Sequence, residues 1–373
     1  MDSAIVVGAG TFGASLAWLM AREGIAVTLI DQFEPGDPRA SSGGESRLIR
    51  CAHGADADYT ASARRARGLW RALEAEAGEE VMVECGMAWF ARREDGWEAA
   101  SLETLGAQGI PAERLEPGDA ARLFPSLGTS DLAFVLWEPE AGVLRAERAV
   151  RALARAAQAH GATIERAVAR PDGDAARLED GRRLEADRIV WACGPWLPSL
   201  FGEHVALRVT RQELYFFAGG PEWASPGVPG WVDYDGAIYG TGDLDGHGVK
   251  AAPDVEGPPL PAAAPLPPAG PEGERAAREY LALRFPSLAS APLRSSRTCR
   301  YEISADSHFV AGPVPGRPVH WVAGGGSGHG FKHGPALAER LIAALRGEAE
   351  LPSHFAVRAR TAGRSLRTAG SNL

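Results

Sequence analysis

Residues 4–31 read AIVVGAGTFGASLAWLMAREGIAVTLID, an apolar run that leads into a G-x-G-x-x-G motif, a helical pattern and a second apolar run. This order predicts a strand, a tight turn, a helix and a parallel strand, the context in which the glycine motif binds a dinucleotide. Gly8 permits the turn, Gly10 lets a pyrophosphate approach the backbone, and Gly13 lets helix and strand pack closely. An ordinary glycine turn in an α/β core is the alternative.

Asp31 ends the second apolar run and would accept hydrogen bonds from ribose hydroxyls. An acid at this position disfavours a 2′-phosphate, so FAD or NAD is expected rather than NADP.

Residues 3–21 carry no charge and are long enough to imitate a membrane span. Their three glycines in a turn pattern and the lack of a basic n-region favour strand plus helix, and no membrane attachment is expected.

The composition is that of an ordinary globular protein. The chain has 373 residues, 45 % of them hydrophobic and 23 % charged, enough for two or three domains. A net charge of −9 argues against general affinity for nucleic acid. Cys51, Cys85, Cys193 and Cys299 show no C-x-x-C spacing, which disfavours a metal site or a disulfide framework and favours the cytoplasm.

Further along, the patterns predict helices at 59–78, with Trp70 in the core, and at 146–160. Residues 81–91 and 163–169 are each predicted as one strand. The run 188–194 ends in glycine and predicts a third parallel strand beside the nucleotide, so this domain is interrupted and resumes after about residue 145. Other strands are predicted mainly in an antiparallel unit, and they cover 134–137, 211–218, 236–239 and 294–303.

Two more stretches carry chemistry. Small residues that include Ser41 and Ser42 precede Arg47 and Arg50, which indicates a backbone passing close to a flat ligand with guanidinium groups aimed at it. A solvated basic turn is the alternative. The run GGGSGHGFK at 324–332 precedes a predicted helix and forms a second anion or ring-edge site, although it lacks the spacing of a Walker A loop.

Together these stretches resemble the flavin-dependent amine oxidoreductases of the D-amino-acid-oxidase superfamily, in particular the monomeric sarcosine oxidase and N-methyltryptophan oxidase branch. The resemblance covers nearly the whole chain. The matching stretches are Gly8 to Gly13 with Asp31, Ser41 to Arg50, Trp191 to Trp196, Tyr239, Lys250, Thr298 to Tyr301, Asp306 to Phe309, and Ser327 to Lys332.

The resemblance implies an α/β fold of the glutathione-reductase type. A Rossmann-like FAD-binding domain would comprise residues 1–80, 145–210 and 300–373. A second, antiparallel-sheet (α+β) domain for the substrate would comprise 81–144 and 211–299, with a Pro/Ala-rich loop at 253–273.

For the cofactor, the resemblance implies FAD. Cys299 matches the cysteine that bonds the flavin 8α-methyl carbon through sulfur, with a buried structural cysteine as the alternative. Arg47 matches the arginine over the flavin face. The other residues that the resemblance assigns to the cofactor are Gly8, Gly10, Gly13, Asp31, Ser41, Ser42, Gly326, Gly328, His329, Gly330 and Lys332.

For the substrate, Arg50 and Lys332 match the pair that binds a carboxylate, a sensible clamp of a planar fork and a point charge. Lys250, one of only two lysines in the chain, matches the lysine that stabilises negative charge on oxygen beside flavin N5. Tyr239 matches a tyrosine of the substrate pocket. Lys250, Arg47 and Tyr239 are therefore the expected catalytic residues.

Three positions depart from the pattern. Asp254 stands where the sarcosine-type enzymes carry a histidine, Gly312 stands where an acid is usual, and residues 37–40 lack the family's active-site histidine. These changes preserve the flavin and oxygen residues but alter the pocket, so sarcosine itself is not the expected substrate.

The sequence thus predicts a monomeric, cytoplasmic amine oxidase that converts an N-methyl or cyclic amino acid to an imine and reduces O2 to hydrogen peroxide. One alternative is a biosynthetic imine-forming oxidase or dehydrogenase with an unusual amine substrate. Another is the flavoprotein subunit of a multi-subunit amine dehydrogenase, which the presence of Lys250 disfavours because a partner acceptor removes the need to activate oxygen.

Overall fold

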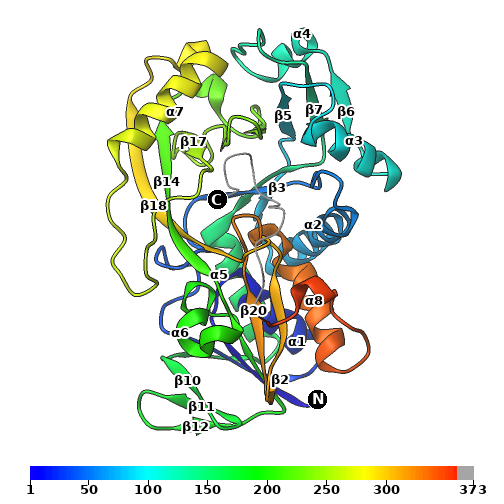
Figure 1. Cartoon of the computed structure of the whole chain (residues 1–373), viewed down its shortest axis with the longest axis vertical. Coiled ribbons are helices and arrows are strands. Elements are labelled where there is room, and N and C mark those ends of the chain that lie inside the picture. Colours follow the sequence, from blue (N-terminus) through cyan, green and yellow to red (C-terminus); the bar gives the residue numbers. More distant parts are fainter. Residues whose placement is uncertain (359–373) are drawn as a thin grey trace.

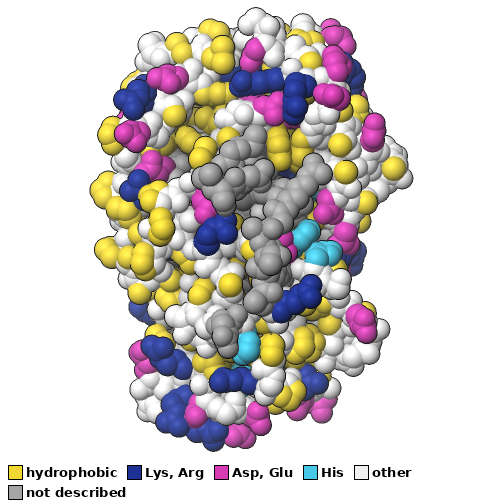
Figure 2. Space-filling view, viewed as in Figure 1, with side chains coloured by type: hydrophobic (Ala, Val, Ile, Leu, Met, Phe, Trp, Pro, Cys, Tyr) yellow, Lys and Arg dark blue, Asp and Glu magenta, His cyan; other side chains and the backbone are white. Residues whose placement is uncertain are grey.

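The computed structural model describes residues 1–358, so the end of the predicted 300–373 segment lies outside the described residues. Two large sheets organise the molecule, one in the lower half of Figure 1 and one in the upper half. Charged side chains of both signs are mixed over the face that Figure 2 shows. None of the helices among residues 1–358 is long and apolar enough to cross a bilayer.

The lower sheet has six strands in the order β19-β20-β13-β1-β2-β9. All neighbours are parallel except the edge pair β19 and β20. Val7 pairs with both Ile30 and Trp191, which brings the ends of three strands to one edge. The strands are β1 (Ser3–Val7), β2 (Ala26–Asp31), β9 (Thr163–Arg166), β13 (Arg188–Trp191), β19 (Val310–Val314) and β20 (Arg317–Gly324).

Both faces of this sheet are covered. Helix α1 (Thr11–Arg22) is buried from Thr11 to Ala21, because α2 (Ala57–Ala77), α5 (Ala146–Ala159) and α8 (Gly334–Leu345) share one apolar core with it. A separate core on the other face joins the sheet to α6 (Leu197–Phe201) and a small meander. The meander strands are β10 (Ala169–Asp172), β11 (Ala175–Leu178) and β12 (Arg183–Leu184).

The upper sheet has eight strands in the order β18-β14-β17-β16-β15-β5-β7-β6, with one parallel pair, β15 and β5. Helix α7 (Pro271–Arg284) shares an apolar core with this sheet, and α3 (Trp97–Ala107) contacts β5 and β7. The strands are β5 (Met87–Ala91), β6 (Glu113–Leu115), β7 (Phe134–Glu138), β14 (Arg208–Phe217), β15 (Gly230–Asp233), β16 (Ile238–Thr241), β17 (Val249–Pro253) and β18 (Leu293–Ile303).

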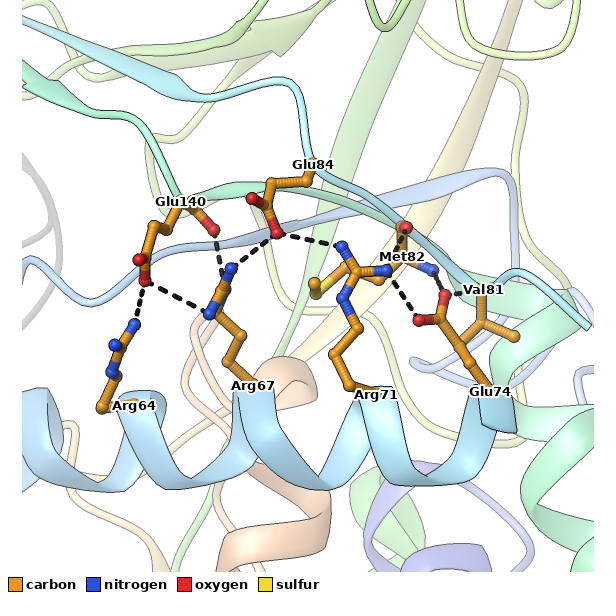
Figure 3. A network of polar contacts seen from close by, with 8 residues as sticks. All are labelled: Arg64, Arg67, Arg71, Glu74, Val81, Met82, Glu84 and Glu140. Carbon is orange, nitrogen blue, oxygen red and sulfur yellow. Dashed lines mark hydrogen bonds and ion pairs between the residues drawn. The ribbon is translucent and has the colours of Figure 1, made fainter. Parts of the chain in front are cut away.

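A third, three-stranded sheet contains β3 (Ser46–Ile49), β8 (Gly142–Arg145) and β4 (Met82–Val83). A row of arginines on α2 ties that helix to this sheet and to the turn before β8, as Figure 3 shows. Arg67 contacts both Glu84 and the carbonyl of Glu140, the latter at 2.8 Å. Arg71 donates to Glu84 at 2.9 Å.

The predicted fold class is confirmed, but two strand predictions are wrong. Residues 81–91 form two strands in different sheets, because the chain turns at Gly86, whose φ is +78° and where a Cβ would lie 1.8 Å from the Trp137 ring. Residues 163–169 also split, since β9 ends at Arg166 and Ala169 already belongs to the meander.

Helix α7 begins at Pro271, a residue that suits the first helical turn, so the Pro/Ala-rich loop is shorter than predicted and covers 254–270. The domain boundaries remain predictions.

Candidate active site

The turn between β1 and α1 can be built only from glycine at two positions. Gly8 has φ +104°, and a Cβ there would lie 2.4 Å from the carbonyl oxygen of Ala192, at the end of β13. A Cβ on Gly13 would lie 1.8 Å from the carbonyl oxygen of Gly8. The first turn of α1 is thereby pressed against the strand edge, with its N–H groups at the edge where a phosphate group can bind.

Asp31 lies beside this turn. Its Oδ2 accepts a hydrogen bond from the Ala9 N–H at 2.6 Å, and Oδ1 accepts one from the Phe33 N–H at 2.8 Å. Burial raises the pKa of this carboxyl despite both bonds. Each oxygen keeps acceptor capacity, which suits a ribose hydroxyl.

A cavity of about 480 Å³ runs from this turn toward the upper sheet. Its volume falls within the range of cofactor sites. Of the predicted cofactor residues, those that line it are Gly8, Gly10, Asp31, Ser41, Ser42, Arg47, Gly326, Gly328 and Gly330. Gly13 lies beneath the turn, and His329 and Lys332 line a neighbouring pocket instead.

Arg47 lines this cavity, and Cys299 lies next to Arg47 behind the lining residues. The Arg47 guanidinium donates to the carbonyl oxygens of Ser41 and Gly43 at 2.8 and 2.9 Å, so its position is fixed by backbone. Cys299 on β18 is buried, with its Sγ 3.9 Å from both Arg47 Nη2 and the Ser41 carbonyl oxygen. The thiol therefore lies next to two residues of the cavity wall.

The second glycine loop closes the cavity. A Cβ on Gly330 would lie 2.7 Å from the Gly326 Cα and 2.8 Å from the Phe12 ring, so the loop folds back on itself against α1. The Gly326 N–H donates to Glu302 Oε1 at 3.4 Å. Burial raises the pKa of this carboxyl to about 7. Glu302 was not predicted from the sequence, because it follows Cys299 by three residues on β18, an odd spacing that places the two side chains on opposite faces of the strand.

A smaller pocket adjoins the cavity, because Arg47, Tyr301, Gly328 and Phe331 line both. The predicted residues Arg50, Tyr239 and Lys332 line this pocket. Its other walls come from distant parts of the chain, and they are Leu48, Trp89, Trp97, Val232, Tyr234, Asp254 and His329. Trp89, Trp97 and Tyr234 were not predicted as pocket residues, because they come from three separate segments: β5, the start of α3 and the residue after β15.

Arg50 is held by aromatic faces and by a buried acid. Its guanidinium carbon lies 5.0 Å from the Trp89 ring centroid and 5.9 Å from that of Trp97. Burial lowers its pKa to about 10, and the nearby Glu138 carboxylate opposes that shift. Glu138 is itself fixed, since it accepts hydrogen bonds at 2.8 Å from the Cys51 N–H and from Trp89 Nε1.

Lys332 is buried and lines the same pocket as Arg50. Its Nζ donates to the His329 carbonyl oxygen at 2.9 Å. Burial, and then the charge of Arg50, place its pKa well below the usual value. Trp70, predicted as a core residue, is fully buried and also donates from Nε1 to the Lys332 carbonyl oxygen at 2.8 Å. Among the residues that line the pocket, Arg47, Arg50 and Lys332 outnumber the acid Asp254, and this excess of positive charge favours a bound anion.

Lys250 lies deeper, on β17, and is 1 % exposed. Its Nζ is 3.4 Å from the Ser46 carbonyl oxygen, 3.5 Å from Ser46 Oγ and 4.9 Å from the Tyr239 ring centroid. Burial lowers its pKa well below the usual value, and the charges of Arg47 and Arg297 add to the effect. Burial also raises the pKa of Tyr239.

Three buried histidines lie behind Lys332. Ligand atoms of His53, His329 and His333 all fall within 4.8 Å of one another, and two ring nitrogens, His53 Nε2 and His333 Nε2, are 3.3 Å apart. Burial lowers the pKa of each, with further lowering from Arg50 and Lys332. The same two positive charges disfavour a divalent cation here, so we interpret the group as neutral packing that supports the Lys332 segment.

Comparison with protein families and curated proteins agrees with this geometry. The model of the family described as DAO, FAD dependent oxidoreductase, matches residues 3–345. Monomeric sarcosine oxidase of Bacillus sp. (strain B-0618) is 28 % identical over 362 residues, which cover 93 % of each chain. N-methyl-L-tryptophan oxidase of Yersinia pestis (strain Pestoides F) is 26 % identical over 349 residues, which cover 91 % of this chain and 93 % of the relative.

Solved structures share the fold. L-proline dehydrogenase from P. horikoshii superposes with a TM-score of 0.83 at 20 % identity, covering 94 % of this chain and 95 % of that one. NikD, described as an unusual amino acid oxidase essential for nikkomycin biosynthesis, superposes with a TM-score of 0.79 at 22 % identity. The match covers 98 % of this chain and all of NikD. Such identities bear on the architecture alone.

Proposed function

Because the chain belongs to the DAO family of FAD-dependent oxidoreductases, we propose that it oxidises a secondary α-amino acid, N-methyl or cyclic, to an imine. Molecular oxygen would be the acceptor and hydrogen peroxide the second product. The observation that carries the proposal is the contact between the dinucleotide-sized cavity and a pocket that holds a pair of cations, Arg50 and Lys332.

The residues present suit FAD. The glycine turn would face the pyrophosphate, Asp31 the ribose, and Arg47 with the adjacent Cys299 the ring system. When bound, the cofactor accepts a hydride equivalent from the carbon next to the amine nitrogen and passes the electrons on to oxygen. We propose that Cys299 Sγ tethers it covalently, which its position beside Arg47 and Ser41 supports.

The substrate would be held by its carboxylate. Arg50 offers a planar fork and Lys332 a point charge, and both are fixed by neighbours, so they would orient the substrate carbon toward the cavity. The aromatic walls exclude water from the same space. No side chain is assigned as a general base, because a neutral amine can lose hydride without one.

Lys250 is proposed to stabilise negative charge that develops on oxygen. A buried ammonium in a site with few water molecules acts strongly on such charge. Tyr239, whose ring lies next to this lysine, would separate it from the substrate.

We further propose that the enzyme works as a monomer in the cytoplasm, which the names of the sarcosine oxidase relatives and the cysteine spacing support.

The test uses the purified holoprotein. A panel of N-methyl and cyclic amino acids is mixed with it anaerobically, flavin absorbance is followed, and oxygen uptake with peroxide formation is then measured in air. Flavin reduction by at least one such amine together with peroxide release is the expected result. If no amine reduces the flavin, the proposed function is wrong, and reduction with negligible oxygen uptake would indicate a dehydrogenase that needs another acceptor.

Covalent attachment is tested separately. Acid-precipitated protein should stay yellow, whereas the Cys299→Ser variant should release its flavin into the supernatant. Cys85→Ser, at a half-buried cysteine that lines neither cavity nor pocket, serves as the control and should behave like the parent protein. A colourless pellet from the parent protein would contradict the tether.

A further inference from the structure

The buried ammonium of Lys250 has two arginines as neighbours, Arg47 on β3 and Arg297 on β18. Burial lowers the pKa of Lys250, and the charges of both arginines lower it further. Its hydrogen bonds to protein are long, since Nζ lies 3.4 Å from the Ser46 carbonyl oxygen and 3.5 Å from Ser46 Oγ. The surroundings of Lys250 therefore favour loss of the proton that its proposed role requires.

Glu45 opposes this effect. It directly precedes Ser46, the residue that Lys250 contacts, and its negative charge raises the pKa of the lysine. An ionised Cys299 would act in the same direction, but a sulfur bonded to the cofactor carries no charge. Once the proposed tether has formed, Glu45 is the main negative charge that residues 1–358 place near Lys250.

Glu45 is fixed by Arg297. The Nε of Arg297 lies 2.8 Å from Glu45 Oε2 and 3.1 Å from Oε1. The backbone before Glu45 leaves room for this arginine, because Gly44 has φ +95° and a Cβ there would lie 1.9 Å from Arg297 Nη2. Burial acts to raise the pKa of Glu45, but the charges of Arg297 and Lys250 hold it below its usual value. Glu45 is therefore a carboxylate at neutral pH.

The two members of this ion pair act on Lys250 in opposite directions, because Arg297 lowers its pKa and Glu45 raises it. At short range the two effects do not cancel, so removal of either member leaves the other uncompensated. Loss of Glu45 would leave Arg47, Arg297 and Lys250 as three cations without this acid. Loss of Arg297 would leave Lys250 with a carboxylate that no longer has a partner of its own.

We propose that Glu45, held by Arg297, is a positioning residue that keeps Lys250 protonated and thereby sets the upper pH limit of the reaction with oxygen. An amine that has lost its proton cannot stabilise negative charge on oxygen. This inference rests on the proposed function, in which Lys250 assists oxygen, and it adds the ion pair that controls the charge of that lysine.

The direct test depends on the chain having only two lysines, Lys250 and Lys332. Holoprotein labelled with ¹³C at the lysine ε-carbon should give one NMR signal for each, and Lys250→Met assigns them. Each signal follows the charge of its own amine as the pH changes. In Glu45→Gln the midpoint of the Lys250 signal should fall by about one pH unit, and in Arg297→Gln it should rise by about as much.

The Lys332 signal is the internal control. Its pKa is lowered by burial and then by the charge of Arg50, and neither Glu45 nor Arg297 is among the causes. Its midpoint should therefore stay the same in both variants. Glu45→Gln keeps the shape of the side chain and one acceptor for Arg297, so this variant decides the question even if Arg297→Gln fails to fold.

A second measurement links the charge to oxygen. The flavin is reduced by light rather than by an amine, and its reoxidation is followed by stopped flow from about pH 6 to about pH 10. The rate should fall above the Lys250 midpoint, and this fall should move with the midpoint in both variants. Rates that do not follow the midpoint would overturn the assignment of Lys250 to oxygen.

An unchanged Lys250 midpoint in Glu45→Gln would overturn the inference. Shifts in the same direction in both variants would also overturn it, because they would indicate a structural disturbance rather than a charge effect. The same holds for a Lys250 amine that is already neutral at about pH 6 in the parent protein. Because light replaces the amine, failure of every amine to reduce the flavin would remove the proposed function without changing these results.

Discussion

The two lysines of this arginine-rich chain both lie buried at the candidate active site. Arginine stays protonated in nearly any surroundings, whereas the pKa of a lysine falls readily when the ammonium loses water. Lys250 and Lys332 show that fall, since burial is the largest cause in each case. Because these residues are lysines, a group that binds next to either ammonium can change its pKa and therefore its charge.

Lys250→Met should slow flavin reoxidation by oxygen by about a hundredfold, because it removes the ammonium proposed to stabilise charge on oxygen. Anaerobic reduction by substrate should change by only a few fold. Stopped-flow measurement of the two half-reactions separates these effects. Equal slowing of both would show that Lys250 shapes the pocket rather than assisting oxygen.

Glu302 should make stability depend on pH. Burial raises its pKa in the folded state from 4.5 to about 7, so the folded protein holds this proton where the unfolded chain has lost it. Its contribution to stability is therefore largest below pH 4.5 and is lost as the pH rises through about 7. Glu302→Gln should raise the unfolding free energy relative to the parent by about 1–3 kcal/mol at pH 8, and by much less at pH 5. Thermal unfolding of both flavin-loaded proteins at the two pH values checks this, and a difference that does not vary with pH would contradict it.

At the scale of single elements, α1 depends on a glycine that is inside the helix. Gly13→Ala would place a methyl group 1.8 Å from the Gly8 carbonyl oxygen, so the helix must move away from β1. We expect loss of flavin and of most folded protein. Gly68→Ala on α2 is the control, since open space surrounds Gly68 and the change should stabilise the protein by roughly 0.5–1 kcal/mol. Flavin content and melting temperature report the outcome, and a Gly13→Ala protein with full flavin would contradict the packing described.

The elements that the sequence predicted well are those whose signals are local. The β1–α1–β2 unit has its apolar runs, its glycines and Asp31 within a single stretch. Strand β13 was predicted from one further apolar run that ends in glycine. The break at Gly86 could not be predicted, because its cause is the Trp137 ring from another strand. The pocket walls could not be predicted either, since Trp89 and Val232 become neighbours only through the pairing of β5 with β15.

At the scale of the whole molecule, α2 supports both halves. Its apolar side packs with α1 and α8, and its arginine row contacts the short sheet from which the chain continues into β5 (Figures 1 and 3). Arg67 is the centre of that row, with a side chain only 19 % exposed. The row therefore joins the helices that cover the six-stranded sheet to the short sheet that leads into the eight-stranded one.

Arg67→Ala should lower the unfolding free energy by about 1–2 kcal/mol, because it leaves two acids and a partly buried carbonyl without their shared donor. Arg65→Ala removes an exposed pair with Glu339 on the same helix and should cost less than about 0.5 kcal/mol. Chemical denaturation of both variants measures the difference. Equal costs would show that the row contributes no more than ordinary surface charges.

The loop 254–270 begins with a residue of the smaller pocket and passes Ala263, which lines the cofactor cavity. Arg300 and Thr298 hold it by hydrogen bonds to the carbonyl oxygens of Pro261 and Pro267, at 3.3 and 2.6 Å. One surface segment, free of helix and strand, thus borders both compartments while the nucleotide turn lies on a different sheet. Mutations in this loop can therefore accumulate during evolution and change which substrate the enzyme accepts, while the residues that bind the cofactor stay the same.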